Sequence, residues 1–243
     1  QVAAAYFQLE SENLPPADPA DDWCQLVDYD PEAEKRVLAA LLYRFSASSY
    51  DRIWAYLQTC SREQMEEMVC KATANINKFD APLRELEYAT YTFDLVIDQG
   101  AYFEIKRHRM MSQTPQALST QLGYTLPQTI VDAGFETQYH QAMQTAYLAY
   151  QQLAEFNPEI AAYIVPNAYN RRLLMRANIR SLDHLIALRS APNAHFSVRR
   201  LAHRMAADIN DVSPLAKYWI RDNGEETWQQ VEEKFFACTN CQP

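Results

Sequence analysis

The chain has 243 residues, 48% of them hydrophobic, which is enough for one large domain or two small ones with a buried core. Its formal net charge of −9 argues against a general nucleic-acid-binding protein. There is no run of 18 apolar residues and no recognisable signal peptide, so we expect no membrane partner and a cytoplasmic location.

Positive charge is concentrated in one part of this acidic chain. The first 34 residues contain no Lys or Arg, whereas eight arginines fall between residues 171 and 204, where Asp183 is the only acid. These are Arg171, Arg172, Arg176, Arg180, Arg189, Arg199, Arg200 and Arg204. We therefore expect this part of the chain to hold an anion.

The five cysteines form an odd, scattered set, which predicts reduced cytosolic thiols. Cys238-Thr-Asn-Cys241 is a lone CxxC motif. Because no second pair and no nearby His accompanies it, we expect a solvated tail there and no metal site.

The N-terminal residues have the composition of an extended arm. Residues 11–22 (SENLPPADPADD) are acidic and proline-rich, so we assign residues 1–22 to an N-terminal arm or linker, 23–233 to one domain and 234–243 to a C-terminal tail. The chain begins with Gln1 rather than Met, which is compatible with removal of an N-terminal portion.

Two helices are predicted next. Asp30-Pro31-Glu32 is typical of a helix start, and apolar residues follow at helical spacing: Val37, Leu38, Leu41, Leu42 and Phe45. Ser61-Arg-Glu-Gln64 has the form of a capping box for a helix that ends near residue 76.

From Glu87 the pattern changes to a period of two, which predicts a strand over 87–97 with Ala89, Tyr91, Phe93 and Leu95 on one face. A second strand is expected over 172–178. Helices are expected around 139–153, 181–188 and 196–209. The fold class is therefore α+β, a mostly helical domain around a small antiparallel sheet.

A basic tetrad, Lys106-Arg107-His108-Arg109, follows the first strand after a short apolar stretch. One interpretation is a solvated charged face. The preceding apolar residues favour a partly buried segment instead, and partly buried arginines match planar phosphate or carboxylate partners.

A second polar cluster contains Asn178, Arg180, His184 and Arg189. Arg180 and His184 are four residues apart and would share one helix face, while Asn178 ends a strand beside the helix start, where an anion is favoured. The alternative is that His184 and Arg189 only tie the helix to neighbouring acids.

No residue pattern indicates covalent chemistry by the chain itself. There is no HExxH motif, no nucleophile with a base at an interpretable spacing, and only four glycines, too few for a phosphate loop. His195 and His203 are expected to be structural. Chemistry would then come from a cofactor.

The two clusters together resemble the flavin-dependent (alternative) thymidylate synthases. Arg107-His108-Arg109-Met-Met-Ser112 matches the first half of that family's RHR-x-x-S motif, and residues 86–93 (LEYATYTF) resemble the strand before it. Val165-Pro166-Asn167, the segment from Asn178 to Arg189 and residues 193–200 (NAHFSVRR) are similar to the family's later motifs. The resemblance covers about residues 35–222.

The resemblance implies a homotetramer of the thymidylate synthase complementing protein fold that binds FAD between subunits. It implies methylation of C5 of dUMP, with methylenetetrahydrofolate and NADPH as co-substrates. By position, the FAD-binding residues would be Arg107, His108, Arg109, Asn178, Arg180 and His184. The dUMP-binding residues would be Glu104, Lys106, Ser119 and Arg189. Arg189 would also be catalytic, since it would favour the ionised N3 of the uracil.

The chain departs from the family pattern after Ser112. The family's N-E-x-S-x-R becomes Thr114 to Gln121, with Ala117 and Gln121 in place of the Glu and Arg. Glu104 stands where the family has a Gln. Ala162 stands where the family has an Arg, and the family's flavin-contacting His falls near Pro82. Two lost phosphate ligands, at roughly 2–5 kcal/mol each in a desolvated site, would abolish dUMP binding.

Three hypotheses follow. The first is a thymidylate synthase in which Arg171, Arg172 and Arg176 replace the lost phosphate ligands. The second is a flavoenzyme of the same fold that acts on another nucleotide or substrate. The third is a non-catalytic synthase-like half of a tandem protein or a mixed oligomer.

Overall fold

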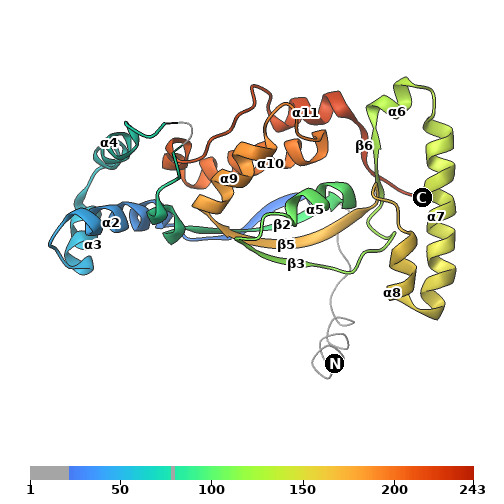
Figure 1. The fold of residues 1–243 in the computed structure, drawn as a ribbon, viewed down its shortest axis with the longest axis horizontal. Coiled ribbons are helices and arrows are strands. Elements are labelled where there is room, and N and C mark those ends of the chain that lie inside the picture. Colours follow the sequence, from blue (N-terminus) through green and yellow to red (C-terminus); the bar gives the residue numbers. More distant parts are fainter. Residues whose placement is uncertain (1–21, 78–79) are drawn as a thin grey trace.

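The computed structural model describes residues 22–77 and 80–243, so nearly all of the expected N-terminal arm lies outside the described residues. Its centre is a four-stranded antiparallel sheet with the strand order β1-β2-β5-β3 (Figure 1). The strands are β1 (Cys24–Tyr29), β2 (Thr90–Asp98), β5 (Asn170–Asn178) and β3 (Ser112–Pro115). Helices cover one face of this sheet and flank its ends, and the α+β prediction is confirmed.

The sheet buries one face and leaves the other polar. Residues at alternate positions of β2, including Tyr91, Phe93 and Leu95, are fully buried, as the period of two predicted. Phe93 lies opposite the buried Met175 of β5, while Thr92 lies opposite the exposed Arg176. In Figure 1 the buried face is covered by α5 (Gln99–Ile105), α9 (Ile179–Arg189) and α10 (Phe196–Val212).

The strand expected over 87–97 begins later. Residues from Arg84 to Tyr88 form a short 3₁₀ helix, η1, and β2 starts at Thr90. The Glu87 carboxylate forms ion pairs with Arg84 on its own turn and with Arg180 on α9, which stabilises the turn instead of a strand. Tyr88, the last residue of η1, is exposed and is not part of the strand.

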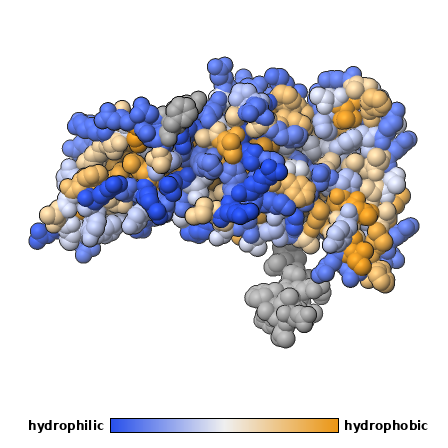
Figure 2. Space-filling view, viewed as in Figure 1, coloured by the Kyte–Doolittle hydropathy of each residue, from blue (hydrophilic) through white to orange (hydrophobic). Residues whose placement is uncertain are grey.

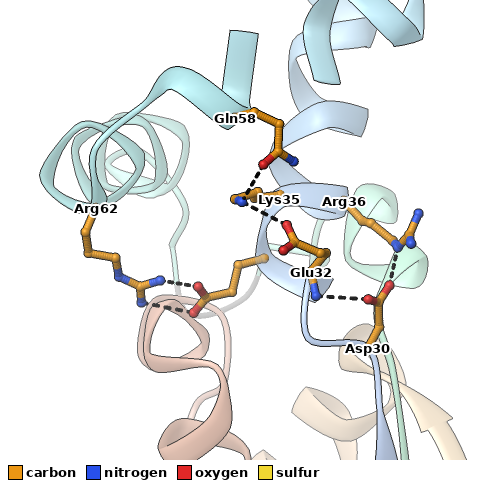
Figure 3. Close-up of polar contacts among 7 residues, drawn as sticks. Asp30, Glu32, Lys35, Arg36, Gln58 and Arg62 are labelled. Atoms are coloured by element: carbon orange, nitrogen blue, oxygen red, sulfur yellow. Dashed lines mark hydrogen bonds and ion pairs between the residues drawn. The ribbon is translucent and has the colours of Figure 1, made fainter. Parts of the chain in front are cut away.

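The first helix is α2 (Ala33–Phe45), and its start is stabilised by Asp30. The Asp30 carboxylate accepts a hydrogen bond from the Glu32 amide at 2.9 Å and pairs with Arg36, as Figure 3 shows. Lys35 bridges Glu32 and Gln58 in the same view. The predicted helix is present but begins at Ala33, two residues after Pro31, its expected first position. Phe45, expected on the apolar face, is 80% exposed because it lies at the last position of the helix.

Two further helices follow α2. They are α3 (Tyr50–Thr59) and α4 (Arg62–Thr73). The predicted capping box of α4 is present, with Ser61 and Gln64 bonded reciprocally. The helix ends at Thr73, three residues before the expected end.

A second, smaller hydrophobic cluster lies at the far end of the molecule (Figure 1). It packs beneath α7 (Glu136–Phe156), the expected long amphipathic helix, and includes Tyr124, Met143, Tyr150 and Tyr169. Nearby elements are β4 (Tyr124–Pro127), α6 (Gln128–Asp132), α8 (Pro158–Ala161) and η2 (Ala162–Ile164). Figure 2 shows apolar residues gathered on this end.

The C-terminal cysteines differ from their prediction as a solvated tail with reduced thiols. Residues 236–241 form strand β6 (Phe236–Cys241), which pairs with β4. Cys238 and Cys241 are joined as a disulfide, while Cys24, Cys60 and Cys70 are free. The hydrogen bonds of β4 and the burial of Phe236 hold this segment, which is why the solvated-tail interpretation is wrong. The preceding helix is α11 (Trp228–Phe235).

Three of the clustered arginines have structural roles on α10. Arg200 is buried between the rings of Trp23 and Phe236 and forms an ion pair with Glu232 at 2.8 Å. Arg199 and Arg204 lie over other aromatic rings of the same cluster. The arginines of the charge-rich window are therefore divided among several places in the fold, since these three pack against aromatic rings.

The two histidines expected to be structural are so. His203 is buried and pairs with Asp222 at 2.9 Å, and the His195 ring accepts a hydrogen bond from the amide of Ser197 at the start of α10. Among residues 22–77 and 80–243, no helix is long and apolar enough to cross a membrane, and no cluster of three or more metal-ligating side chains is found.

Candidate functional site

The basic tetrad lies at the end of α5 and is held there by its neighbours. The Asp98 carboxylate accepts a hydrogen bond from the Ala101 amide and begins α5. After the helix ends, Gln113 of β3 donates hydrogen bonds to the carbonyls of Ile105 and His108, at 3.1 and 2.9 Å. The loop is therefore tied to the sheet edge instead of extending into solvent.

The second cluster lies directly opposite, at the start of α9. Asn178 ends β5 and caps α9, since its side-chain oxygen accepts a hydrogen bond from the Ser181 amide at 2.9 Å. The Ser181 hydroxyl donates to the carbonyl of Met110 at 2.8 Å, which joins α9 to the loop that carries the tetrad. The two motifs, about 70 residues apart in the chain, meet at this contact.

A cavity of about 490 Å³ lies between the two motifs, within the size range of small-molecule sites. Seven of the residues expected to form the site line it: Arg107, His108, Arg109, Asn178, Arg180, His184 and Arg189. Five arginines line it against a single acid, Glu87, among the described residues. The site therefore favours an anionic ligand.

His108 is the buried member of the tetrad. Burial lowers its pKa to about 4, and the nearby Arg189 and His184 act in the same direction, while Glu104 opposes them. Its ring is therefore neutral at neutral pH. Because its Nε2 accepts a hydrogen bond from Arg189 Nε at 3.3 Å, we assign its proton to Nδ1. The His184 ring meets it edge-on at 5.6 Å.

Arg189 is held by groups on α5. Its guanidinium forms an ion pair with the Glu104 carboxylate at 2.5 Å and a long hydrogen bond with the Glu104 carbonyl at 3.5 Å. Its side chain is 15% exposed. The arginine is therefore positioned at the cavity wall with its charge partly neutralised by Glu104.

Three other lining arginines differ in how far their charge is paired within the chain. Arg180 forms an ion pair with Glu87 at 3.1 Å and donates to the carbonyl of Pro82. Arg107 is 70% exposed, with a long contact to Glu104 at 3.6 Å. Arg109 is exposed and has no hydrogen bond or ion pair to any residue in the described ranges. Arg107 and Arg109 thus leave positive charge available to a ligand.

Three residues expected to bind substrate do not line this cavity. Lys106 is exposed, with its ammonium over the ring of Phe103 at 4.3 Å. Ser119 lies in the irregular segment after β3, where its hydroxyl accepts a hydrogen bond from the Gln121 amide. The third, Glu104, does not line it either and acts through Arg189.

The arginines proposed to replace lost phosphate ligands also lie elsewhere. Arg172 and Arg176 point from the polar face of β5, where they pair with Asp94 and Asp28. Arg171 lies over the ring of Tyr102 and donates to the carbonyl of Gln116. The alternation of side chains along β5 places Arg172 and Arg176 on the face away from the core, whereas Arg171 lies at the start of β5, at the opposite end of the strand from α9, and none of the three lines the cavity.

The sequence predicts no binding role for the other lining residues, which are Pro82, Glu87, Met110, Met111, Ser181, Leu188 and Arg221. Its pattern places Glu87 in a strand and Ser181 in a helix. Arg221, far along the chain, forms an ion pair with the buried Asp183 at 2.6 Å. The one signal for it was Asp183, the single acid in an arginine-rich window.

Comparison with known proteins identifies relatives over most of the chain. The family model described as Thy1, thymidylate synthase complementing protein, matches residues 25–215. A UPF0159 protein of Chlamydia muridarum is 35% identical over 201 residues, which are 81% of this chain and 37% of that protein. A flavin-dependent thymidylate synthase of Sulfurisphaera tokodaii is 26% identical over 208 residues, or 82% and 77% of the two chains.

A solved structure has the same fold. The crystal structure of a UMP/dUMP methylase PolB from Streptomyces cacaoi, bound with 5-Br dUMP, superposes with a TM-score of 0.62. It covers 79% of this chain and 91% of that one at 17% identity, so the likeness concerns the fold alone. The chain spans little more than a third of the length of its Chlamydia relatives.

Proposed function

This chain belongs to the thymidylate synthase complementing protein family, and from that membership we propose that it is a flavin-dependent thymidylate synthase-like enzyme. In the proposed reaction, C5 of dUMP is methylated with methylenetetrahydrofolate, and FAD and NADPH supply the reducing equivalents. The observation that carries this proposal is the convergence of the two polar motifs on one cationic cavity. An anionic, aromatic cofactor requires such an arrangement.

The residues present fit FAD by charge and by polarity. Arg107 and Arg109, exposed at the cavity, suit its phosphates, and Asn178, Arg180 and His184 offer groups for the polar edge of its ring. Bound FAD would supply hydride transfer. The exposed arginines leave room for a second subunit to complete the site in the proposed homotetramer.

Arg189 is the proposed catalytic residue. The neutral His108 ring accepts a hydrogen bond from its Nε, and Glu104 holds its outer nitrogens, so the guanidinium has one orientation. A cation fixed in this way stabilises negative charge that develops on a uracil ring without reorganising during the reaction. His108 and Glu104 are positioning residues for Arg189 in this proposal.

One observation favours a second candidate, which has two forms: a flavin-binding family member that acts on a substrate other than dUMP, and a non-catalytic family member that does not bind flavin. The 2.5 Å ion pair with Glu104 partly neutralises the charge of Arg189, and Lys106 and Ser119 do not line the cavity. The dUMP phosphate then lacks the ligands that the resemblance implied. FAD binding is common to the first candidate and the substrate variant of the second.

The two candidates separate in a pair of measurements on the purified full chain. Reconstitution with FAD should give a yellow protein with a flavin absorbance band after removal of free cofactor. A protein that stays colourless would support the non-catalytic form. With reduced flavin and the folate co-substrate, C5-deuterated dUMP should release its label only if the synthase activity is present.

We expect Arg189→Ala to abolish that release, because it removes the fixed cation from the cavity wall. Arg176→Ala is the matched control, since Arg176 lies on the polar face of the sheet outside the cavity, and it should release label like the wild type. Unchanged release by the Arg189 variant would remove Arg189 from its proposed role.

A further inference from the structure

A second cavity, of about 350 Å³, lies at the end of α5 opposite to the basic tetrad, where the first turns of α5 and α10 meet β4, α6 and α7. Its volume is within the range of small-molecule sites. No described residue lines both this cavity and the first one. A ligand bound here would therefore occupy a site of its own.

Asp98 is the buried polar residue of this cavity. It is 7% exposed, and its carboxylate accepts hydrogen bonds from the Ala101 amide at 2.8 Å and from the Ser197 hydroxyl. It forms no ion pair with any residue that the structure describes, whereas the other two buried acids of that part of the chain, Glu85 and Asp183, each pair with an arginine. Burial of a carboxylate without an opposite charge is costly, so a cation in this cavity would be stabilised.

The wall of the cavity supplies no such cation. Among its described lining residues, Asp98 is the only Asp, Glu, Lys or Arg. Arg200, a cation within electrostatic range of Asp98, does not line the cavity and is paired with Glu232 at 2.8 Å. The His195 Nδ1 accepts a hydrogen bond from the Ser197 amide, so the neutral ring carries its proton on Nε2. The charge of this cavity is therefore opposite to that of the first.

The surroundings of Asp98 admit a ligand and offer a second acceptor. Gly100 has no side chain, and a Cβ there would lie 3.0 Å from Asp98 Oδ1. Tyr139 donates its hydroxyl hydrogen to the carbonyl of Thr125 at 2.9 Å, which leaves its oxygen able to accept a hydrogen bond. Burial raises the pKa of Tyr139 to about 12, and the charge of Asp98 acts in the same direction, so the phenol stays uncharged beside the carboxylate.

Much of the remaining wall is apolar, with Pro127, Ile130 and Phe196 among its residues. From the buried carboxylate without a cationic partner, the second acceptor and these apolar surfaces, we propose that this cavity binds a small organic cation, a primary ammonium group on a compact aromatic or aliphatic body. The ammonium donates hydrogen bonds to the Asp98 carboxylate and to the Tyr139 oxygen. The body packs against the apolar wall, where the Phe196 ring also attracts a cation.

The test compares two probes of the same size, benzylammonium and benzyl alcohol, in calorimetric titrations of the full chain at neutral pH. We expect benzylammonium to bind about tenfold tighter or more, the effect of a charge-assisted hydrogen bond to a buried carboxylate. Equal binding of the two probes, or no binding of either, would overturn the proposal. The titration needs no flavin, so its outcome is independent of the proposed function.

Two variants locate the binding. Asp98→Asn removes the charge but keeps a good helix cap, so α5 is retained, and the preference for benzylammonium should fall to about twofold or less. Gly100→Ala places a Cβ against Asp98 Oδ1 in a helix that tolerates alanine, and it should weaken benzylammonium binding about fivefold or more. The Gly100 variant carries the test if the Asp98 variant fails to fold.

Two controls complete the design. Asp94→Asn removes a carboxylate that pairs with Arg172 on the polar face of the sheet, outside the cavity, and it should leave the affinity for benzylammonium unchanged. An equal loss in the Asp94 and Asp98 variants would show attraction to the overall negative charge of the protein and contradict the proposal. Excess flavin mononucleotide should not displace benzylammonium, and displacement would place the amine in the first cavity and overturn the proposal.

Discussion

His108, Arg189 and Glu104 form a line of contacts in which each residue sets the state of the next. Glu104 pairs with Arg189, and Arg189 donates to the His108 ring. The positive charge of Arg189 and burial together disfavour the charged form of His108, and its pKa falls to about 4. Solvent exposure is low for both Arg189 and His108, so screening by water is limited.

His108 should make stability depend on pH between about 6.5 and 4. In this window His108 is protonated in the unfolded chain but stays neutral in the folded protein. The free energy of unfolding therefore decreases as the pH falls, by up to about 3 kcal/mol. Urea unfolding at several pH values should show a steeper dependence for the wild type than for His108→Gln, which cannot titrate. Identical pH dependences would contradict this assignment.

Glu104→Gln tests the neutralisation of Arg189. The amide keeps the shape of the side chain but removes the charge, so the affinity of the cavity for the anionic probe flavin mononucleotide should rise about tenfold. The pKa of His108 should fall further, because Glu104 is the group that raises it. Flavin titration and NMR of the His108 ring measure the two effects. Weaker flavin binding would show that Glu104 assists the ligand.

At the scale of elements, the site depends on how β5 passes into α9. Asn178 occupies the last position of the strand and the cap of the helix, so one side chain both begins α9 and lines the cavity. The same transition brings Arg180 and His184 to the wall on successive turns. Ser181 then anchors the helix start to the carbonyl of Met110.

Asn178→Ala should lower the free energy of unfolding by about 1 kcal/mol through loss of the cap, and it should also weaken flavin binding. Ser61→Ala is the matched control, because it removes the cap of α4, which does not line the cavity. It should lower stability by a similar amount and leave flavin binding unchanged. Equal effects on flavin binding would mean that Asn178 acts only through stability.

At the scale of the whole molecule, α10 joins the two ends of the described chain. Arg200 lies between Trp23 near the start and Phe236 near the end, and Arg204 lies over Trp228. These contacts link the start of the described chain, next to β1, to α11 and β6 through α10. They account for arginines that the sequence had grouped with an anion site.

Arg200→Ala should lower the free energy of unfolding by about 3 kcal/mol, since it removes buried ring contacts and leaves Glu232 without its partner. Arg176→Ala should change it by less than about 1 kcal/mol, because its pair with Asp28 is exposed. Chemical denaturation of the three proteins checks both values. A similar small loss in both variants would show that the aromatic contacts of Arg200 do not stabilise the fold.

Local patterns determined much of this protein. The alternation along β2, the capping box at Ser61 and the spacing in α7 each predicted their element, because short-range periodicity and capping depend on neighbours in the chain. The sequence also identified the two polar motifs and predicted that each could bind an anionic ligand. Its errors include two element ends, at Phe45 and near Glu87, and the C-terminal segment, which pairs with β4 instead of forming a solvated tail.

The tertiary structure alone decided which of the many cations share a cavity. Arg180 and Arg189 reach it, whereas Arg172 and Arg176 pair on the polar sheet face and Arg200 is enclosed by aromatic rings. Composition cannot distinguish these positions, because each depends on the pairing of β5 with β2 and on the packing of α10. The Glu104–Arg189 ion pair likewise exists only when α5 and α9 are brought together, 85 residues apart in the chain.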